Sequence, residues 1–519
     1  MPPEIEYTRA SKNYHSCMYV SHCWHGFFCL LFQMASSAVS KIVRSSVTLA
    51  RPSSSAPRPT WRRRYSAHSR FTPLYVTGPE ATSNHVAVLA DHADGQEVLK
   101  EGSETRREME KSIEARGHDL DIGLTEMAEK LARVRSLEKQ RSSLVAERAA
   151  LGLAAKGGGD EAAAAKERLV EVKALLNKCA ADRVDLDQSA VRPFILGLPN
   201  DLHKRCPSGD SRILPLAASN AQPPKFSFPA ADHLALASDE LDFCLHSSDA
   251  AFYLFGRLAQ LELALGWRAQ SVFGDQLRYS AMTGPDFVKS VVIDACGEDH
   301  RCGEASLSVV PCKEMKGRDT GYGQHLVGSA SLFSMISYWC KNVIRRPASM
   351  PLSHYTLGRQ YRPKLSGYQS PNLFTTQQST AVQLLTLSAS PSSSEEQLEE
   401  TMSALARFYD ELGVHYRMVA VSAKDLGKAE RFRMSVQMYT TQGYREVGNV
   451  SDYGSYISRR LMMKTEEQQQ QMKNVHVVGG TAIDITKFIG CAVEGSQKKD
   501  GSYDLGTLSN LAQQMWEPK

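Results

Sequence analysis

The chain has 519 residues, of which 42% are hydrophobic, enough to build two or three domains with sizeable cores. Its formal net charge of +4 is unevenly distributed, because residues 1–79 carry ten Lys/Arg and only two acidic residues. The remainder is slightly acidic, which excludes nucleic-acid binding driven by mean charge and requires a local basic patch instead. The eleven cysteines include no C-x-x-C pair, which argues against a disulfide framework and favours a reducing compartment.

The first 78 residues have the composition of a targeting segment. No Asp or Glu occurs between Met34 and Gly78, and serines are frequent there. The basic residues of this span are Lys41, Arg44, Arg51, Arg58, Arg62, Arg63, Arg64 and Arg70. A basic, Ser-rich, acid-free leader is typical of a mitochondrial transit peptide. We therefore predict a presequence over 1–78 and a mitochondrial matrix location. Met34 is an alternative start, and a secretory signal around Phe27–Phe32 is the competing interpretation.

Two further classes of site are not favoured by the sequence. No segment is long and apolar enough to span a bilayer, so no membrane association is predicted. The tightest group of zinc-type ligands is Cys296, His300, Cys302 and Cys312. Their spacings match no standard zinc pattern, so the sequence favours buried thiols over a metal site.

Residues 79–190 are predicted to form an N-terminal domain built on a helical hairpin. Apolar residues recur at steps of three, four and seven over 124–151, which is typical of a coiled-coil face. A glycine break at 157–159 precedes a second apolar pattern over 169–179, so two antiparallel helices should fold back on each other. The hairpin is either an oligomerisation element or an RNA-reaching arm. The candidate RNA-binding residues are Arg133, Lys139, Arg141 and Arg148, whose alternative role is a solvated helix face.

Residues 191–519 alternate strand-like and helical segments, with glycines and prolines between them, which predicts an α+β domain. Ser388–Glu395 is predicted to be a loop, Leu398–Leu412 an amphipathic helix and Glu466–Gln471 an exposed polar loop. The sequence contains no internal repeat and no P-loop.

Several motifs resemble one known family, in that family's order, from about Ser112 to Trp516. IEARGHDLDI (Ile113–Ile122) resembles the start of the arm domain of seryl-tRNA synthetases, and LPNDLH (Leu198–His203) resembles the linker that follows the arm. YREVGNVSDYGSYISRRL (Tyr444–Leu461) resembles the strand before that family's paired arginines, and GGTA (Gly479–Ala482) resembles its third motif. The resemblance implies a class II catalytic domain over 191–519, with an antiparallel sheet flanked by helices. It also implies a dimer, and an active site for ATP, serine and tRNA.

Three residues match positions that bind substrates in this family. Arg362 stands where the second motif carries its phosphate-binding arginine. Glu446 stands where the family has a metal-binding carboxylate. Thr481 belongs to the glycine-threonine of the third motif. The resemblance implies that these are vestigial ATP, Mg²⁺ and serine positions.

Other positions of the implied active site have lost the family's residue. The substituted positions are Ser331, Lys364, Thr375, Ser379, Gln383, Asn449, Gly479 and Lys487. The resemblance places a glutamate at Ser331, Lys364 and Gln383, an arginine at Thr375 and Lys487, and a stacking phenylalanine at Ser379. Leaving a charged substrate group without its partner costs about 2–5 kcal/mol, and each 1.36 kcal/mol is about tenfold in rate.

These substitutions predict loss of catalysis and no bound cofactor, with ATP and Mg²⁺ implied only if activity is retained. The combination resembles the seryl-tRNA synthetase-like mitochondrial proteins of insects. It implies a partnership with the authentic mitochondrial seryl-tRNA synthetase, or a homodimer, together with binding of tRNA or another mitochondrial RNA. The alternatives are an active, divergent serine–tRNA ligase and a stand-alone mitochondrial RNA-binding protein.

Overall fold

The computed structural model of this protein describes most of the chain after residue 94. The described residues are 95–117, 123–157, 159–215, 225–244, 251–300, 307–309, 323–345, 349–363, 371–466 and 471–516. The predicted presequence, Lys364 and most of the Glu466–Gln471 tract lie outside them. Within the described part, no helix is both long enough and apolar enough to cross a bilayer.

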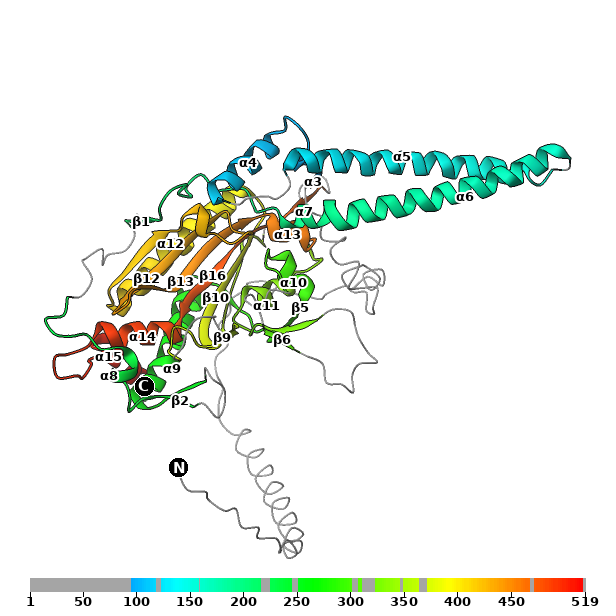
Figure 1. Ribbon diagram of the computed structural model, residues 1–519. Helices are drawn as coiled ribbons and strands as arrows, with labels where there is room; N and C mark the ends of the chain where they lie inside the picture. Colours follow the sequence, from blue (N-terminus) through cyan, green and yellow to red (C-terminus); the bar gives the residue numbers. More distant parts are fainter. Residues whose placement is uncertain are drawn as a thin grey trace, which may run out of the picture. The chain divides into compact units, whose positions relative to one another are not determined.

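The N-terminal part is helical, as the hydrophobic periodicity predicts. Its elements are α3 (Gly95–Val98), α4 (Glu104–Arg116), α5 (Leu124–Ala154), α6 (Asp160–Leu186), the π-helical turn η3 (Asp187–Val191) and α7 (Arg192–Gly197). The long helices α5 and α6 lie side by side as a hairpin (Figure 1). They bury Val134, Leu137 and Leu144 of α5 and Val172 and Leu176 of α6, so the apolar stripe of each helix is covered by the other.

The rest of the chain is built on an eight-stranded sheet in the order β1-β11-β12-β13-β16-β10-β9-β4. All pairs are antiparallel except β4 with β9. The strands are β1 (Arg212–Leu214), β4 (Ser280–Ala281), β9 (Leu352–Tyr361), β10 (Gln378–Ser388), β11 (Tyr416–Ala420), β12 (Phe432–Thr440), β13 (Gly443–Gly454) and β16 (His476–Asp484). The predicted fold class, a helical hairpin followed by an antiparallel sheet flanked by helices, is confirmed.

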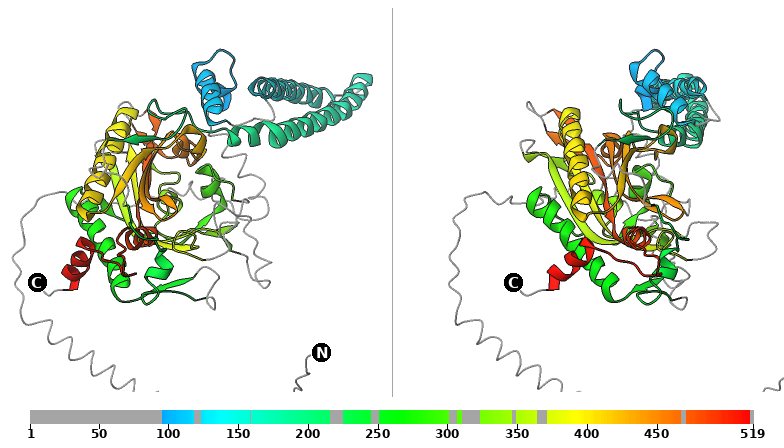
Figure 2. Two further views of the ribbon diagram at one scale, coloured as in Figure 1. Left: turned by 60° about the vertical axis from the view of Figure 1, so that its left-hand side comes forward. Right: turned by 90° about the vertical axis from the view of Figure 1, so that its left-hand side faces the viewer.

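Helices cover both faces of this sheet (Figures 1 and 2). α9 (Gly256–Gln270), α12 (Pro391–Leu412) and α14 (Ile485–Gly495) pack on one face, and α10 (Ser290–Ala295), α11 (Leu332–Ser337) and α13 (Tyr456–Arg460) on the other. Leu384 and Leu385 of β10 belong to opposite cores, because neighbouring strand residues point to opposite faces. The remaining helices are α8 (His233–Leu236), η4 (Ser271–Gln276), η7 (Ala423–Asp425) and α15 (Thr507–Trp516). The remaining strands are β2 (Leu241–Phe243), β3 (Phe252–Leu254), β5 (Phe287–Lys289), β6 (Leu307–Val309), β7 (Gln324–Leu326), β8 (Val343–Ile344), β14 (Lys464–Glu466) and β15 (Met472–Asn474).

The predicted loop Ser388–Glu395 is wrong over most of its length. Ser388 is the last residue of β10, and α12 begins at Pro391. Ser390 caps this helix, because its side chain accepts a hydrogen bond from the backbone N–H of Ser393. A serine followed by proline at the first helical position is a helix-start signal, and the run of serines concealed it. The predicted end of the helix at Leu412 is correct.

The linker motif and α4 join the helical hairpin domain to the sheet domain. The amide of Asn200 donates hydrogen bonds to the backbone oxygens of Ala429 and Tyr453, both at 2.8 Å. The guanidinium of Arg116 at the end of α4 donates to the backbone oxygens of Gly427 at 3.0 Å and Glu430 at 2.5 Å. The loop 427–430 is therefore held from the N-terminal side by side chains that are themselves buried.

Candidate active site

Four of the motif residues, Gln383, Asn449, Gly480 and Thr481, line one cavity of about 230 Å³. Strands β10, β12, β13 and β16 contribute to its walls, together with the loop 427–430 and the segment after α10. Its lining residues are Cys296, Glu298, Leu332, Phe333, Gln383, Gly427, Ala429, Glu430, Arg433, Asn449, Tyr453, Gly480 and Thr481. Gln383 and Thr481, which the family resemblance assigns to one active site, lie together although 98 positions separate them.

The wall that carries Gln383 and Thr481 is polar but uncharged. The hydroxyl of Thr481 donates to the side-chain oxygen of Gln383 at 3.1 Å. The amide of Gln360 on β9 donates to the Thr481 hydroxyl at 3.1 Å and to the backbone oxygen of Ala330 at 2.6 Å. These neutral groups satisfy one another, and this wall offers no carboxylate to an ammonium group.

Ser331 has a structural role at the position where the family resemblance expects a carboxylate. It is the N-cap of α11, where its side chain accepts from the backbone N–H of Ser334. Its hydroxyl donates to the backbone oxygen of Gly328 at 2.8 Å. Both hydrogen bonds hold Ser331 within its own turn, so it supplies no charge to the cavity.

Arg362, the expected phosphate-binding residue, is occupied by a partner from the same chain. Its guanidinium donates to the carboxylate of Asp484 at 2.8 Å and to the hydroxyl of Ser379 at 3.1 Å. The ammonium of Lys487 lies 3.5 Å from the same oxygen of Asp484. Burial lowers the pKa of Lys487, and the neighbouring cation of Arg362 lowers it further, although Asp484 opposes both effects. One carboxylate therefore pairs with both Arg362 and Lys487 and offsets one of their two positive charges.

Asp484 is held firmly in this position. It is the N-cap of α14, because its other carboxylate oxygen accepts from the backbone N–H of Lys487 at 3.2 Å. It is 4% exposed. A carboxylate at a helix N-terminus is also favoured by the helix dipole, so the fold of α14 itself fixes the anion beside Arg362.

Glu446, the expected metal ligand, is also engaged within the chain. It accepts hydrogen bonds from the guanidinium of Arg433 and, at 2.9 Å, from the side-chain amide of Asn449. Burial opposes the ionisation of Glu446, but the Arg433 cation and the hydrogen bonds outweigh it, and the pKa of Glu446 lies below its ordinary value. Glu446 is thus an ionised carboxylate whose counter-charge is already present.

The remaining predicted positions lie away from the cavity. Thr375 lies in a turn, where its backbone N–H and its hydroxyl both bond to the backbone oxygen of Asn372, and it does not line the cavity. Arg133, Lys139, Arg141 and Arg148 are all exposed on α5. Asp484, Arg433 and Glu430 were not predicted from the sequence, since no motif marks these residues and only their spatial neighbours reveal their role.

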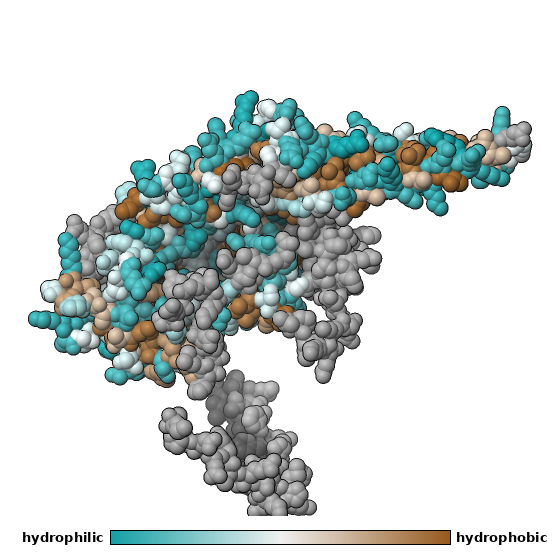
Figure 3. Space-filling view, viewed as in Figure 1, coloured by the Kyte–Doolittle hydropathy of each residue, from teal (hydrophilic) through white to brown (hydrophobic). Residues whose placement is uncertain are grey.

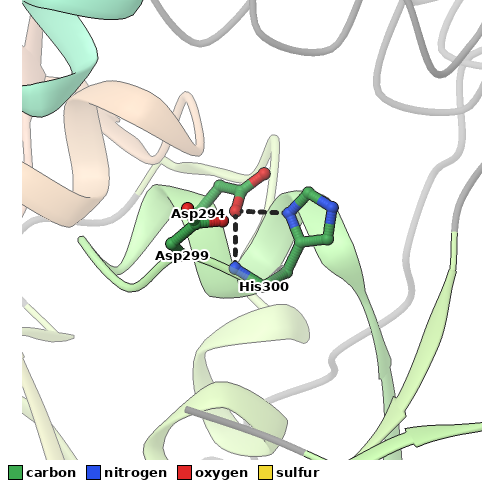
Figure 4. A group of neighbouring side chains, drawn as sticks. All are labelled: Asp294, Asp299 and His300. Atoms are coloured by element: carbon green, nitrogen blue, oxygen red, sulfur yellow. Dashed lines mark hydrogen bonds and ion pairs between the residues drawn. The ribbon is translucent and has the colours of Figure 1, made fainter. Parts of the chain in front are cut away.

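A separate cluster of possible metal ligands lies at the end of α10 and in the segment that follows it. Asp294, Asp299 and His300 offer ligand atoms that lie within 4.8 Å of one another (Figure 4). Asp294 already accepts hydrogen bonds from the backbone N–H and the ring of His300, the latter at 2.7 Å. Of the cysteines considered for zinc, Cys296 is buried, which raises the pKa of its thiol, and Cys302 and Cys312 lie outside the described residues. The hydrogen bonds to Asp294 are sufficient to explain this grouping.

Comparisons with known proteins agree with the sequence motifs. Residues 323–496 match the family model described as the tRNA synthetase class II core domain (G, H, P, S and T). The chain is 27% identical over 447 residues to the serine–tRNA synthetase-like protein Slimp of Drosophila melanogaster, covering 84% of this chain and 91% of that protein. It is 23% identical over 405 residues to the serine–tRNA ligase of Neisseria meningitidis serogroup C, covering 76% of this chain and 92% of the ligase.

Solved structures share the fold. The cytoplasmic serine–tRNA ligase of Naegleria fowleri, solved in complex with AMP, superposes with a TM-score of 0.66 at 15% identity, covering 80% of this chain and 97% of that one. The seryl-tRNA synthetase of Pyrococcus horikoshii, complexed with ATP, superposes with the same TM-score of 0.66 at 16% identity, covering 79% and 96% of the two chains.

Proposed function

Because this chain belongs to the seryl-tRNA synthetase family of class II synthetases, we propose that it is a non-catalytic member that supports mitochondrial seryl-tRNA aminoacylation and translation. The ion pair between Arg362 and Asp484 is the observation that carries the proposal. Adenylate formation requires free cations to bind the ATP phosphates. Here the retained arginine and Lys487 both pair with one buried carboxylate, so each cation already has a partner within the chain.

The serine side of the site supports the same proposal. An amino-acid ammonium needs anionic or strongly accepting neighbours when it is taken out of water. Ser331 caps a helix, and Gln383 is neutral and bonded to Thr481. Each missing carboxylate removes one anionic partner of the bound ammonium, at a cost of about 2–5 kcal/mol.

The proposed setting is the mitochondrial matrix, and the proposed partner is the authentic mitochondrial seryl-tRNA synthetase, with a second copy of this chain as the alternative. The basic, acid-free leader supports the location. An apolar patch on the sheet domain supports a protein partner, since Leu263 and Trp267 of α9 and Leu357 of β9 are 52%, 41% and 42% exposed. Gly266 lies against Leu357, which joins the two elements into one surface.

We expect affinity purification of the full chain from mitochondria to recover a catalytic seryl-tRNA synthetase. Trp267→Glu should reduce this recovery at least about tenfold, because it places a charge in the apolar patch. Phe287→Glu, at an exposed apolar side chain of β5, is the matched control and should leave recovery unchanged. Recovery of this chain alone, as a homodimer, would contradict the proposed partnership.

RNA binding through the helical hairpin is the second part of the proposal. Arg133, Lys139, Arg141 and Arg148 are exposed on α5, and no ion pair to any of them occurs among the described residues. Hydrophilic residues cover much of the visible hairpin surface, with hydrophobic residues between them (Figure 3). The unpaired arginines and lysine are available for phosphate oxygens, whose neutralisation releases counterions from RNA.

We expect the triple substitution Arg133→Gln, Arg141→Gln and Arg148→Gln to weaken tRNA binding and to reduce its salt dependence. The slope of log K against log salt should fall by roughly 0.7–0.9 for each phosphate that the variant no longer neutralises. Filter binding at several salt concentrations measures both quantities. Lys166→Gln, Lys173→Gln and Lys178→Gln on α6 remove the same charge and are the matched control. Equal weakening in both triple variants would assign binding to net charge and not to this face of α5.

A further inference from the structure

Arg433 points from β12 into the cavity and contacts two carboxylates. One guanidinium nitrogen donates a hydrogen bond to Glu446, and the other lies 3.6 Å from Glu430. Glu430 is fixed independently of Arg433, because its oxygens accept from the hydroxyl of Ser451 at 2.7 Å and from the backbone N–H of Gly427 at 2.9 Å. A single positive charge is therefore centred between two held anions.

The group next to Glu446 presents donors and not acceptors toward this position. Asn449 donates its side-chain N–H to Glu446, and its side-chain oxygen accepts from the backbone N–H of Thr481 at 3.3 Å. These two contacts together orient the amide with its NH₂ group toward the carboxylate. Mg²⁺, Mn²⁺ and Ca²⁺ require oxygen ligands that turn lone pairs toward the ion. A guanidinium and an amide NH₂ supply none.

The residues as they stand do not fit the divalent cation that the family resemblance implies beside Glu446. We infer that Arg433 occupies the position of this cation, so that the chain carries its own counter-ion and its folded site excludes a divalent metal. The inference rests on the proposed function, because both hold that this site does not catalyse adenylate formation. Arg433 prevents metal binding beside Glu446, and this effect is independent of the pairing between Arg362 and Asp484.

Arg433→Ala should remove the positive charge that lies between Glu430 and Glu446. Its removal leaves Glu430 and Glu446 with no cation between them, and burying unpaired carboxylates is strongly unfavourable. A hard divalent ion restores the balance, since two carboxylates and a reoriented Asn449 oxygen form a donor set of the kind such ions use. We therefore expect Arg433→Ala to bind Mg²⁺ or Mn²⁺ at the position that the Arg433 guanidinium occupies in wild type.

The test uses the nucleotide-free full chain and Mn²⁺ as the probe. We expect wild type to leave the paramagnetic resonance signal of free Mn²⁺ unchanged, and Arg433→Ala to bind the ion at least about tenfold more tightly. Mn²⁺ should also raise the thermal midpoint of Arg433→Ala and not that of wild type. Arg417→Ala, on the adjacent strand β11 and stacked on Tyr444 with its guanidinium 3.5 Å from the ring centroid, is the matched control and should bind no Mn²⁺.

Two outcomes would overturn the inference. The first is wild-type Mn²⁺ binding that Glu446→Gln abolishes, because the metal position would then be open. The second is a folded Arg433→Ala that binds no Mn²⁺. If Arg433→Ala folds only when Mn²⁺ is present, and the double variant with Glu446→Gln does not, the inference stands. Serine-dependent pyrophosphate exchange by wild type would contradict the proposed function, whereas Mn²⁺ binding by the nucleotide-free chain is measured without that reaction.

Discussion

Purified wild-type chain should give no serine-dependent ATP–pyrophosphate exchange above background. The family resemblance expects two substrate-facing carboxylates where this chain has the neutral Ser331 and Gln383. Each such loss costs about 2–5 kcal/mol, and each 1.36 kcal/mol is about tenfold in rate. We therefore expect a rate at least about 10³-fold below that of a catalytic seryl-tRNA synthetase measured alongside it. Clear exchange by the chain would establish the alternative, an active and divergent serine–tRNA ligase in which Arg362, Glu446 and Thr481 still serve catalysis.

ATP binding at Arg362 and Lys487 can be tested separately from catalysis. Asp484→Ser removes the carboxylate that pairs with Arg362 and Lys487 but retains a residue that caps α14 well. We expect wild type to show no ATP binding by calorimetry and Asp484→Ser to gain measurable affinity, while exchange stays absent. Asp500→Ser, at an exposed carboxylate after α14, is the control for the loss of one negative charge. Tight ATP binding by wild type would show that ATP phosphate displaces Asp484 from Arg362, and would contradict this prediction.

Replacing Arg116 should have the largest effect on stability. Its side chain is 3% exposed at the junction of α4 and the sheet domain, and burial lowers its pKa although nearby acidic groups oppose this. It donates to the backbone oxygens of Gly427 and Glu430. Arg116→Met removes this donor from the Glu430 oxygen, whereas the Gly427 oxygen keeps its hydrogen bond from the backbone N–H of Glu430. Since a buried group left without its partner costs about 1–3 kcal/mol, we expect a loss of roughly 1–3 kcal/mol in the free energy of unfolding.

The thermal midpoint, followed by circular dichroism, measures this effect. Limited proteolysis should at the same time cut the Arg116→Met chain between the hairpin domain and the sheet domain, since α4 is no longer held to the loop 427–430. Arg107→Met, at an exposed position of the same helix, should change neither quantity. A normal midpoint for Arg116→Met would mean that the linker contacts of Asn200 join the two domains without it.

Local periodicity and motif order were sufficient to predict the helical hairpin and the fold class of the domain that follows it. The spacing of apolar residues at three, four and seven positions predicted α5 and α6. A helix completes one turn in 3.6 residues, so residues at this spacing lie on one face and can be buried together. Motif order predicted the antiparallel sheet. In this sheet, Gln383 and Thr481 lie together on one wall of one cavity. The start of α12 was missed, because a run of serines resembles a loop unless its Ser-Pro pair is recognised as a helix start.

The charge state of that cavity, in contrast, depends on how the strands are ordered in space. The sheet order β16-β10-β9 places the end of β16 and the end of β9 on either side of β10, so Asp484 and Arg362 meet across 122 positions of sequence. A bulge in the pairing of β12 with β13 accompanies the approach of Arg433 to Glu446. Long charged side chains pair with whichever strand lies beside them in space. The pattern of one strand shows that a residue is charged, but strand order and register determine which charge neutralises it.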